Sequence, residues 1–185
     1  MPNTVMSEME RKMKAALAAL QSDLGTLRTG RATPALLDKI FVEYYGAPTP
    51  LAQMANISSP DPRQLLIAPY DKTTAAAIVG AIAKSPLGFQ ATKDGDNVRV
   101  SVPSLNEERR KEMVKQAGKL AEGQKVSIRN VRRDANDTLK KMEKEGGMTK
   151  DELARYEADV QKITDRFIAD VDKMRTAKEA EIMEV

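Results

Sequence analysis

An apolar stripe with helical spacing continues through about 40 residues in the second half of the sequence, which corresponds to about 60 Å of α-helix at about 1.5 Å per residue. Its members recur at steps of three and four: Met113, Ala117, Leu120, Gln124, Ile128, Val131, Ala135, Leu139 and Met142. Ser104-Leu105-Asn106-Glu107 has the pattern of a capping box at its start, and Gly146-Gly147 marks its end. A helix this long cannot bury its stripe inside a small globule, so it needs partner helices of comparable length.

Two further stretches supply such partners. The first ends at Thr29-Gly30, and its apolar residues are Met6, Met9, Met13, Ala16, Leu20, Leu24 and Leu27. The other begins with the capping box Thr149-Lys150-Asp151-Glu152 and continues with Leu153, Tyr156, Val160, Ile163, Phe167, Val171 and Met174. Three stripes of similar length predict an elongated three-helix bundle formed by residues 1–30 and 105–185. The stripes could instead pair between chains as a coiled coil, but strict heptads are not kept, which favours a monomer.

Gly123 lies inside the long second stretch, where it costs about 1 kcal/mol relative to Ala. It indicates either a close approach of another helix or a tolerated substitution, and we favour the second interpretation.

Residues 31–104 follow a different pattern, because eight of the nine prolines lie there. Alternating Ile40, Val42 and Tyr44 predict one strand, Leu65–Ala68 a second, and alternating Val98, Val100 and Val102 a third. The turn sequence Lys93-Asp94-Gly95-Asp96 precedes the third strand, and Thr73–Ala83 is typical of a short helix. The segment is therefore predicted to be a small α+β domain inserted into the bundle.

The chain enters this insert at Thr29, Gly30 and Arg31 and leaves it at Pro103 and Ser104. Two adjacent short connections at one end of a bundle predict either a hinge or a fixed elbow, and the residues do not decide between them.

The residue types that are missing restrict the chemistry. Without Cys or His there is no disulfide, thiolate nucleophile, imidazole base or Cys/His metal site, and neither common nucleotide-binding glycine loop occurs. Carboxylates and lysines remain as catalysts, but nothing in the sequence singles out a group of them. We therefore predict a binding protein and not an enzyme, with no cofactor and no bound metal.

The sequence also lacks membrane and export signals. No apolar run approaches the roughly 20 residues that span a bilayer, and the start of the chain does not have a basic region followed by an apolar one. We expect no membrane contact and a cytoplasmic location, in a bacterium or in an organelle after processing.

Basic residues gather on one side of the second helix. A projection at about 100° per residue places them within an arc of about 100°, whose centre lies about 120° from the apolar stripe. The arc contains Lys111, Lys115, Lys125, Arg129, Arg132, Arg133, Asn136 and Lys140, with Glu122 as the main exception. A solvated face with ion pairs to Asp134 or Asp137 would explain some of these charges. Three arginines within five residues nevertheless favour phosphate binding, since the guanidinium matches phosphate geometry.

The candidate nucleic-acid site therefore consists of Arg28, Arg31, Lys125, Arg129, Arg132, Arg133 and Lys140. The chain has only seven aromatic residues, too few for a platform on which single-stranded bases stack. Recognition of a folded RNA by its shape and phosphates fits better.

Several motifs, in order along the whole chain, resemble the ribosome recycling factor family. They are Arg28-Thr29-Gly30-Arg31-Ala32-Thr33-Pro34, Leu36-Leu37-Asp38, Val42-Glu43-Tyr44-Tyr45-Gly46, Thr49-Pro50-Leu51, Leu87-Gly88, Glu107-Glu108-Arg109-Arg110-Lys111, Ile128-Arg129-Asn130-Val131-Arg132-Arg133-Asp134, Asp159-Val160-Gln161-Lys162 and Thr164-Asp165. The chain departs from the family pattern at Gln90-Ala91 and at Asn106.

The resemblance implies an L-shaped protein in which a three-helix bundle and a β/α/β domain are joined by a flexible hinge. It implies that the protein binds the large subunit of the post-termination ribosome through ribosomal RNA. Together with elongation factor G, which hydrolyses the nucleotide, it would split the ribosome into subunits and release the mRNA. Arg129 and Arg132 match positions at which the family contacts RNA.

Overall fold

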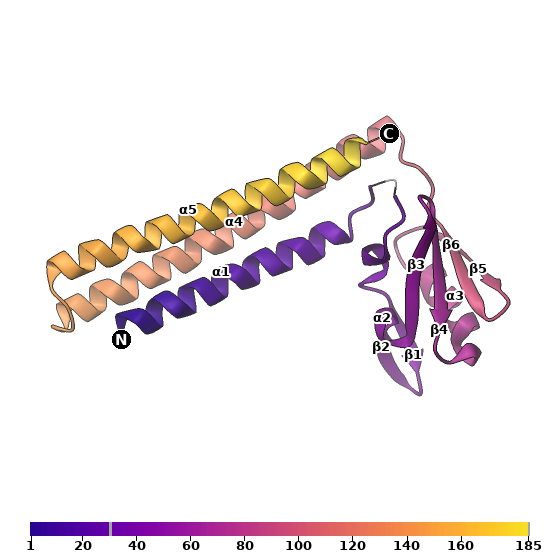
Figure 1. Cartoon of the computed structure of the whole chain (residues 1–185), viewed down its shortest axis with the longest axis horizontal. Helices are drawn as coiled ribbons and strands as arrows, with labels where there is room; N and C mark the ends of the chain where they lie inside the picture. The colour runs from indigo at the N-terminus through magenta and orange to yellow at the C-terminus, as the bar shows by residue number, and fades with distance from the viewer. Residues whose placement is uncertain (30, 185) are drawn as a thin grey trace. The chain divides into compact units, whose positions relative to one another are not determined.

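The computed structural model describes residues 1–29 and 31–184. The chain divides into two compact units, one formed by residues 1–24 and 115–180 and the other by residues 25–114 and 181–185. The predicted α+β class, with three long helices and a strand-containing insert, is confirmed (Figure 1). Among the described residues, no helix combines the length and the apolar character that crossing a bilayer requires.

The first unit is a bundle that contains most of α1 (Pro2–Gly25), α4 (Glu107–Lys144) and α5 (Lys150–Met183), which run alongside one another in Figure 1. Its interior is filled by side chains from all three helices: Met9, Met13, Ala16, Leu20, Leu24, Ala117, Ala121, Ile128, Ala135, Leu139, Val160, Thr164, Phe167 and Val171. The spacing in the sequence predicted most of these positions. Ala121 and Thr164 were not predicted, because a small residue and a hydroxyl do not stand out in an apolar pattern.

Two of the predicted helix ends are displaced. Helix α1 ends at Gly25 and not at Thr29, although Leu27 continues the stripe and is buried. Helix α4 begins after Asn106, whose side-chain oxygen accepts the Arg109 backbone N–H at 2.8 Å, so Asn106 is the N-cap and the Ser104 capping box is wrong.

The other two ends are as predicted. Gly146 has φ +81° and Gly147 donates its N–H to the carbonyl of Met142 at 2.8 Å, which closes α4 with a Schellman motif. Thr149 and Glu152 cap each other reciprocally at the start of α5, with bonds of 2.9 and 3.1 Å.

Gly123 lies in open space. A Cβ added there would meet no atom within 4 Å, so no helix approaches it closely, and the interpretation as a tolerated substitution agrees with the structure.

The second unit contains two antiparallel sheets. Strands β1 (Phe41–Tyr44) and β2 (Ala47–Pro50) form a hairpin. Strands β3 (Ala55–Asp61), β4 (Gln64–Pro69), β5 (Gln90–Asp94) and β6 (Asn97–Ser101) form a four-stranded sheet in the order β3-β4-β6-β5. Four short helices complete the unit: η1 (Pro34–Leu37), α2 (Leu51–Met54), η2 (Lys72–Thr74) and α3 (Ala75–Lys84).

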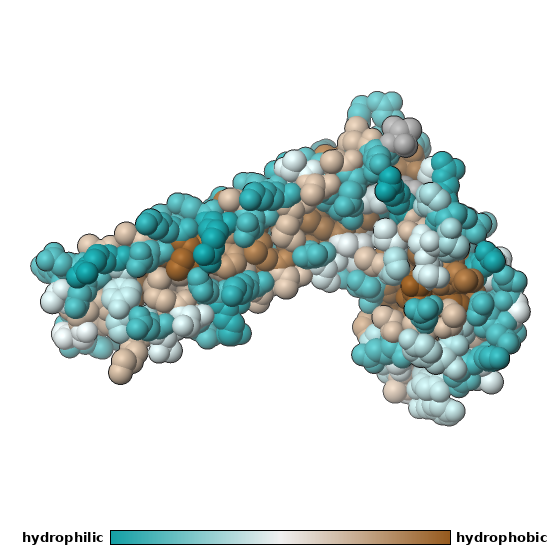
Figure 2. Space-filling view, in the orientation of Figure 1, coloured by the Kyte–Doolittle hydropathy of each residue, from teal (hydrophilic) through white to brown (hydrophobic). Residues whose placement is uncertain are grey.

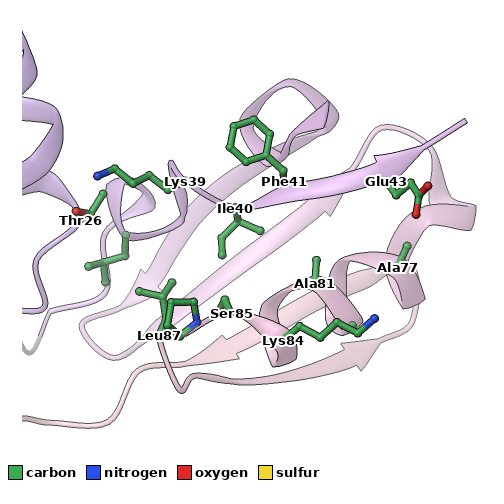
Figure 3. A pocket seen from close by; sticks show the side chains of 13 residues that line it. Thr26, Lys39, Ile40, Phe41, Glu43, Ala77, Ala81, Lys84, Ser85 and Leu87 are labelled. Atoms are coloured by element: carbon green, nitrogen blue, oxygen red, sulfur yellow. The ribbon is translucent and has the colours of Figure 1, made fainter. Parts of the chain in front are cut away.

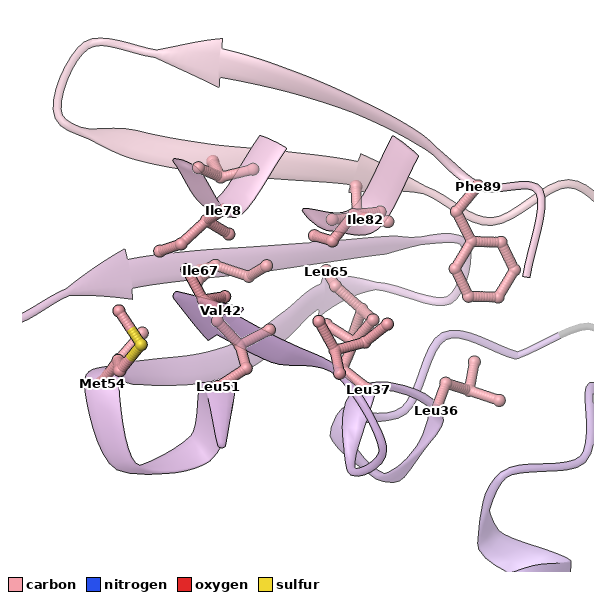
Figure 4. Close-up of a cluster of buried hydrophobic side chains, with 14 of the residues drawn as sticks. Leu36, Leu37, Val42, Leu51, Met54, Leu65, Ile67, Ile78, Ile82 and Phe89 are labelled. Carbon is pink, nitrogen blue, oxygen red and sulfur yellow. The ribbon is translucent and has the colours of Figure 1, made fainter. Parts of the chain in front are cut away.

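The core of this unit lies where α3, β4, β1, α2 and η1 meet (Figure 4). Ile78 and Ile82 of α3 are fully buried, as are Leu65 and Ile67 of β4. Leu51 of α2 is also fully buried in the same cluster. The three predicted strands correspond to β1, β4 and β6. Strands β2, β3 and β5 were missed, because they bury few side chains and carry no apolar pattern.

Candidate RNA-binding surface

The candidate cations on α4 do not all point the same way. At about 100° per residue, Lys125 and Arg132 lie only about 60° and about 40° from Ile128, which is fully buried. Both are accordingly partly buried, and both contact α5. The outer part of the arc is exposed and carries Arg129, Arg133 and Lys140. The single outward-facing arc expected from the sequence is therefore divided into an inner edge and an outer surface.

Lys125, at the inner edge, is held by a carboxylate. Its Nζ lies 2.5 Å from Oδ1 of Asp172 on α5, and only 14% of the Lys125 side chain is exposed. The ion pair compensates the charge of the lysine and links the two helices. Lys125 therefore acts as a tether between α4 and α5 in this structure, and its ammonium is not free.

Arg132, also at the inner edge, is held differently. Its Nη1 donates a hydrogen bond to Oε1 of Gln161 on α5 at 3.2 Å. Gln161 in turn donates from Nε2 to Oδ1 of Asp165, one turn further along α5, at 2.8 Å. Its direct acceptor is a neutral amide, and among the described residues no carboxylate pairs with the Arg132 guanidinium, so in this sense its charge is uncompensated.

The outer cations are more accessible. Arg129 pairs with Glu122 at 3.2 Å, but both side chains are about half exposed, and such surface pairs contribute only about 0–1 kcal/mol. Within the described chain, Arg133 and Lys140 make no side-chain hydrogen bond or ion pair. We call Arg129, Arg132, Arg133 and Lys140 the basic face of α4. It is a row of exposed or uncompensated donors suited to phosphate oxygens.

Arg28 and Arg31 belong to the second unit, and each has a partner there. Arg28 donates from Nη2 to the carbonyl of Pro103 at 2.8 Å, and its guanidinium carbon lies 5.6 Å from the ring centre of Phe89. Its Nε is buried without a partner among the described residues, and this burial, reinforced by the charge of Arg109, lowers the pKa of the guanidinium. Arg31 is exposed and forms an ion pair with Glu184 at 2.5 Å.

The predicted hinge residues can be placed except for Gly30, which lies outside the described residues. Thr29 is buried, whereas Arg31, Pro103 and Ser104 are exposed. The hydrogen bond from Arg28 to Pro103 joins the two connections to the insert. Motion at these residues stays a prediction.

A groove of about 910 Å³ in the second unit was not predicted from the sequence (Figure 3). Its apolar lining includes Ile40, Phe41, Ala81 and Leu87, and Phe41 is 56% exposed. On the face of this unit that Figure 2 shows, there is a hydrophobic patch surrounded by hydrophilic residues. The lining comes from separate segments, η1 to β1 on one side and α3 on the other, so no local motif marks it.

Among the described residues, no group of three or more acidic side chains is placed to hold a metal ion.

The family model described as "Ribosome recycling factor" matches residues 20–183. The chain is 52% identical to the ribosome-recycling factors of Brevibacillus brevis and of Bacillus subtilis, in each case over 185 residues that cover both chains completely.

Solved structures agree with the sequence matches. A solution structure of the ribosome recycling factor is similar with a TM-score of 0.79 at 38% identity, covering 100% of this chain and 98% of that one. A second similar structure describes the T. thermophilus ribosome recycling factor and E. coli elongation factor G bound to the E. coli post-termination complex. This chain matches that recycling factor with a TM-score of 0.71 at 44% identity, and both chains are fully covered. The extent of these matches shows that this chain belongs to the ribosome recycling factor family.

Proposed function

We propose that this protein recycles ribosomes after translation termination. It binds the post-termination ribosome through RNA of the large subunit and, together with elongation factor G, promotes splitting into subunits and release from mRNA. The basic face of α4 is the observation that supports RNA binding most directly, because its guanidinium groups are exposed or uncompensated. The relative seen with elongation factor G on a post-termination complex supports the choice of partners.

The protein contributes binding to this process and no bond-breaking chemistry of its own. Elongation factor G hydrolyses the nucleotide in the proposed reaction. We place this activity in the cytoplasm. We also propose that the protein acts as a monomer, because all three helices of the bundle bury apolar residues against one another within one chain.

The RNA-binding surface is tested with single arginine substitutions. Arg132→Ala and Arg133→Ala should each weaken binding to purified large ribosomal subunits, by about 1–3 kcal/mol if the guanidinium makes charge-assisted hydrogen bonds. Arg132→Lys should recover only part of the loss, because an ammonium lacks the planar donor fork. Arg155→Ala is the matched control, since Arg155 is an exposed arginine of α5 without a side-chain partner in the described chain.

The same experiment is repeated in rising salt. Each phosphate contact releases counterions, so affinity should fall steeply, and the slope should be shallower for Arg133→Ala than for the unmodified protein. Binding that is independent of salt, or equal for Arg133→Ala and Arg155→Ala, would refute the proposed surface.

We also propose that residues 1–30 and 105–185 act as the ribosome-binding domain, and that residues 31–104 move relative to it at the hinge formed by Thr29, Gly30, Arg31, Pro103 and Ser104. The chain has no cysteine, so one cysteine introduced within residues 115–180 and one within residues 31–104 can be bridged by a bis-maleimide that joins the two compact units. The bridged protein should bind ribosomes but fail to split them, while the unbridged double variant does both. Full splitting by the bridged form would show that the motion is dispensable.

A further inference from the structure

Gln161 stands out on α5 because its amide connects two helices. Its Oε1 accepts the Arg132 guanidinium at 3.2 Å, and its Nε2 donates to Asp165 at 2.8 Å. Gln161 and Asp165 are exposed, so these bonds do not serve to satisfy a buried group. We therefore look for a role of these two hydrogen bonds in binding, in addition to any role in the stability of the bundle.

The two bonds fix the direction of the amide. A carboxylate only accepts hydrogen bonds, so Asp165 takes the NH₂ end of Gln161. The carbonyl end must then face Arg132. Asp165 thus keeps the acceptor of Gln161 directed at the guanidinium of Arg132.

The neutrality of this acceptor matters as much as its direction. Lys125 is held by Asp172 and Arg129 by Glu122, and in both pairs a carboxylate compensates the cation. Arg132 is instead held by an uncharged oxygen, which uses one of its five N–H donors and leaves the others available. An amide can therefore orient a guanidinium without competing with a phosphate for its charge.

We propose that Gln161 is a positioning residue, which holds Arg132 in its RNA-binding orientation through an uncharged acceptor whose direction is set by Asp165. This inference rests on the proposed function, because it requires Arg132 to contact RNA. An arginine side chain ordered before binding loses less conformational entropy when the complex forms. Releasing Arg132 should weaken binding to large ribosomal subunits between about threefold and about tenfold.

The variants are chosen so that an effect on the stability of the bundle can be distinguished from an effect on ribosome binding. Gln161→Ala and Asp165→Ala should each weaken binding within that range, whereas Asp165→Asn keeps an acceptor and should largely preserve it. Gln161→Glu places a carboxylate beside Arg132 but also beside Asp165, one turn away, so the new attraction and the new repulsion offset each other and the melting temperature should change little. Binding should nevertheless weaken at least as much as in Gln161→Ala, because the carboxylate compensates the charge of Arg132. If Gln161 had a purely structural role, the affinity of Gln161→Glu for large subunits would change only as far as its melting temperature changes.

The decisive measurement combines Gln161→Ala with Arg132→Ala. If Gln161 acts through Arg132, Gln161→Ala has no further effect on large-subunit affinity once Arg132 is alanine. An undiminished effect in that background would mean that Gln161 acts on RNA directly and would overturn the inference. Wild-type binding by Gln161→Ala, with weak binding by Arg132→Ala, would overturn this inference alone, whereas wild-type binding by Arg132→Ala would overturn the proposed surface as well.

Discussion

Replacing Gly123 by Ala should stabilise the bundle. Gly123 lies in the interior of α4, it is exposed, and an added Cβ meets nothing within 4 Å. The substitution therefore adds no clash and reduces the conformational freedom of the unfolded chain. The expected gain in the free energy of unfolding is about 0.5–1 kcal/mol.

The gain should appear as a higher midpoint of urea unfolding followed by circular dichroism at the helix band, with an unchanged slope. It corresponds to an increase in melting temperature of about 2–4 °C per kcal/mol if the whole chain unfolds together, and about 4–8 °C if the bundle unfolds alone. Ribosome binding should change little, because at about 100° per residue Gly123 lies about 180° from Arg132 and at least about 80° from the other residues of the basic face.

Gly146→Ala provides the control of opposite sign. Gly146 has φ +81° in the Schellman motif that ends α4, so alanine there is strained and should cost about 1 kcal/mol. The reasoning would be refuted if Gly123→Ala were neutral or destabilising while Gly146→Ala showed its expected cost. That result would mean that an unseen close contact, and not backbone freedom, explains the glycine.

Three further predictions concern other parts of the chain. Thr149→Ala removes one half of the reciprocal cap on α5 and should lower the free energy of unfolding by about 1 kcal/mol in urea. Thr164→Val should be neutral or stabilising in the same assay, because the partner of the buried hydroxyl among the described residues is the carbonyl of Val160 in its own helix. A hydrogen bond to Asp71 raises the pKa of Tyr44 to about 12, so its contribution to stability should be complete below about pH 10 and be lost as the pH rises towards 12. Absorbance titration of the four tyrosines should show one late transition that Tyr44→Phe removes and Asp71→Asn shifts to lower pH.

The bundle could be predicted from sequence because its signals are local and repeated. A stripe at steps of three and four places side chains on one face whatever the partner, and a Thr-x-x-Glu box contains both halves of its cap. Errors arose where two local signals overlapped. Ser104 and Asn106 can both cap a helix, and the distance to Arg109 shows that Asn106 does so.

The insert was harder to predict because several strands are defined by pairing and not by pattern. Strand β3 is polar, contains Pro60 and lies at one edge of its sheet, and β5 lies at the other edge. Neither buries a full face, so alternation is absent. Their hydrogen-bonding partners are more apolar, since β4 contains the run Leu65–Ala68 and β6 has alternating valines, and the sequence predicted these two strands together with β1.

The charge partners in the candidate site also could not be predicted from the sequence. A helical projection predicts the direction of each α4 cation, but not the residue that α5 places opposite it. The register of the two helices decides that Lys125 meets a carboxylate and Arg132 an amide. Two cations that a projection treats as equivalent thereby become a compensated tether and an oriented, uncompensated donor. The net charge of +3 does not reveal this difference, so the phosphate binding that we propose for α4 depends on which partner each cation already has.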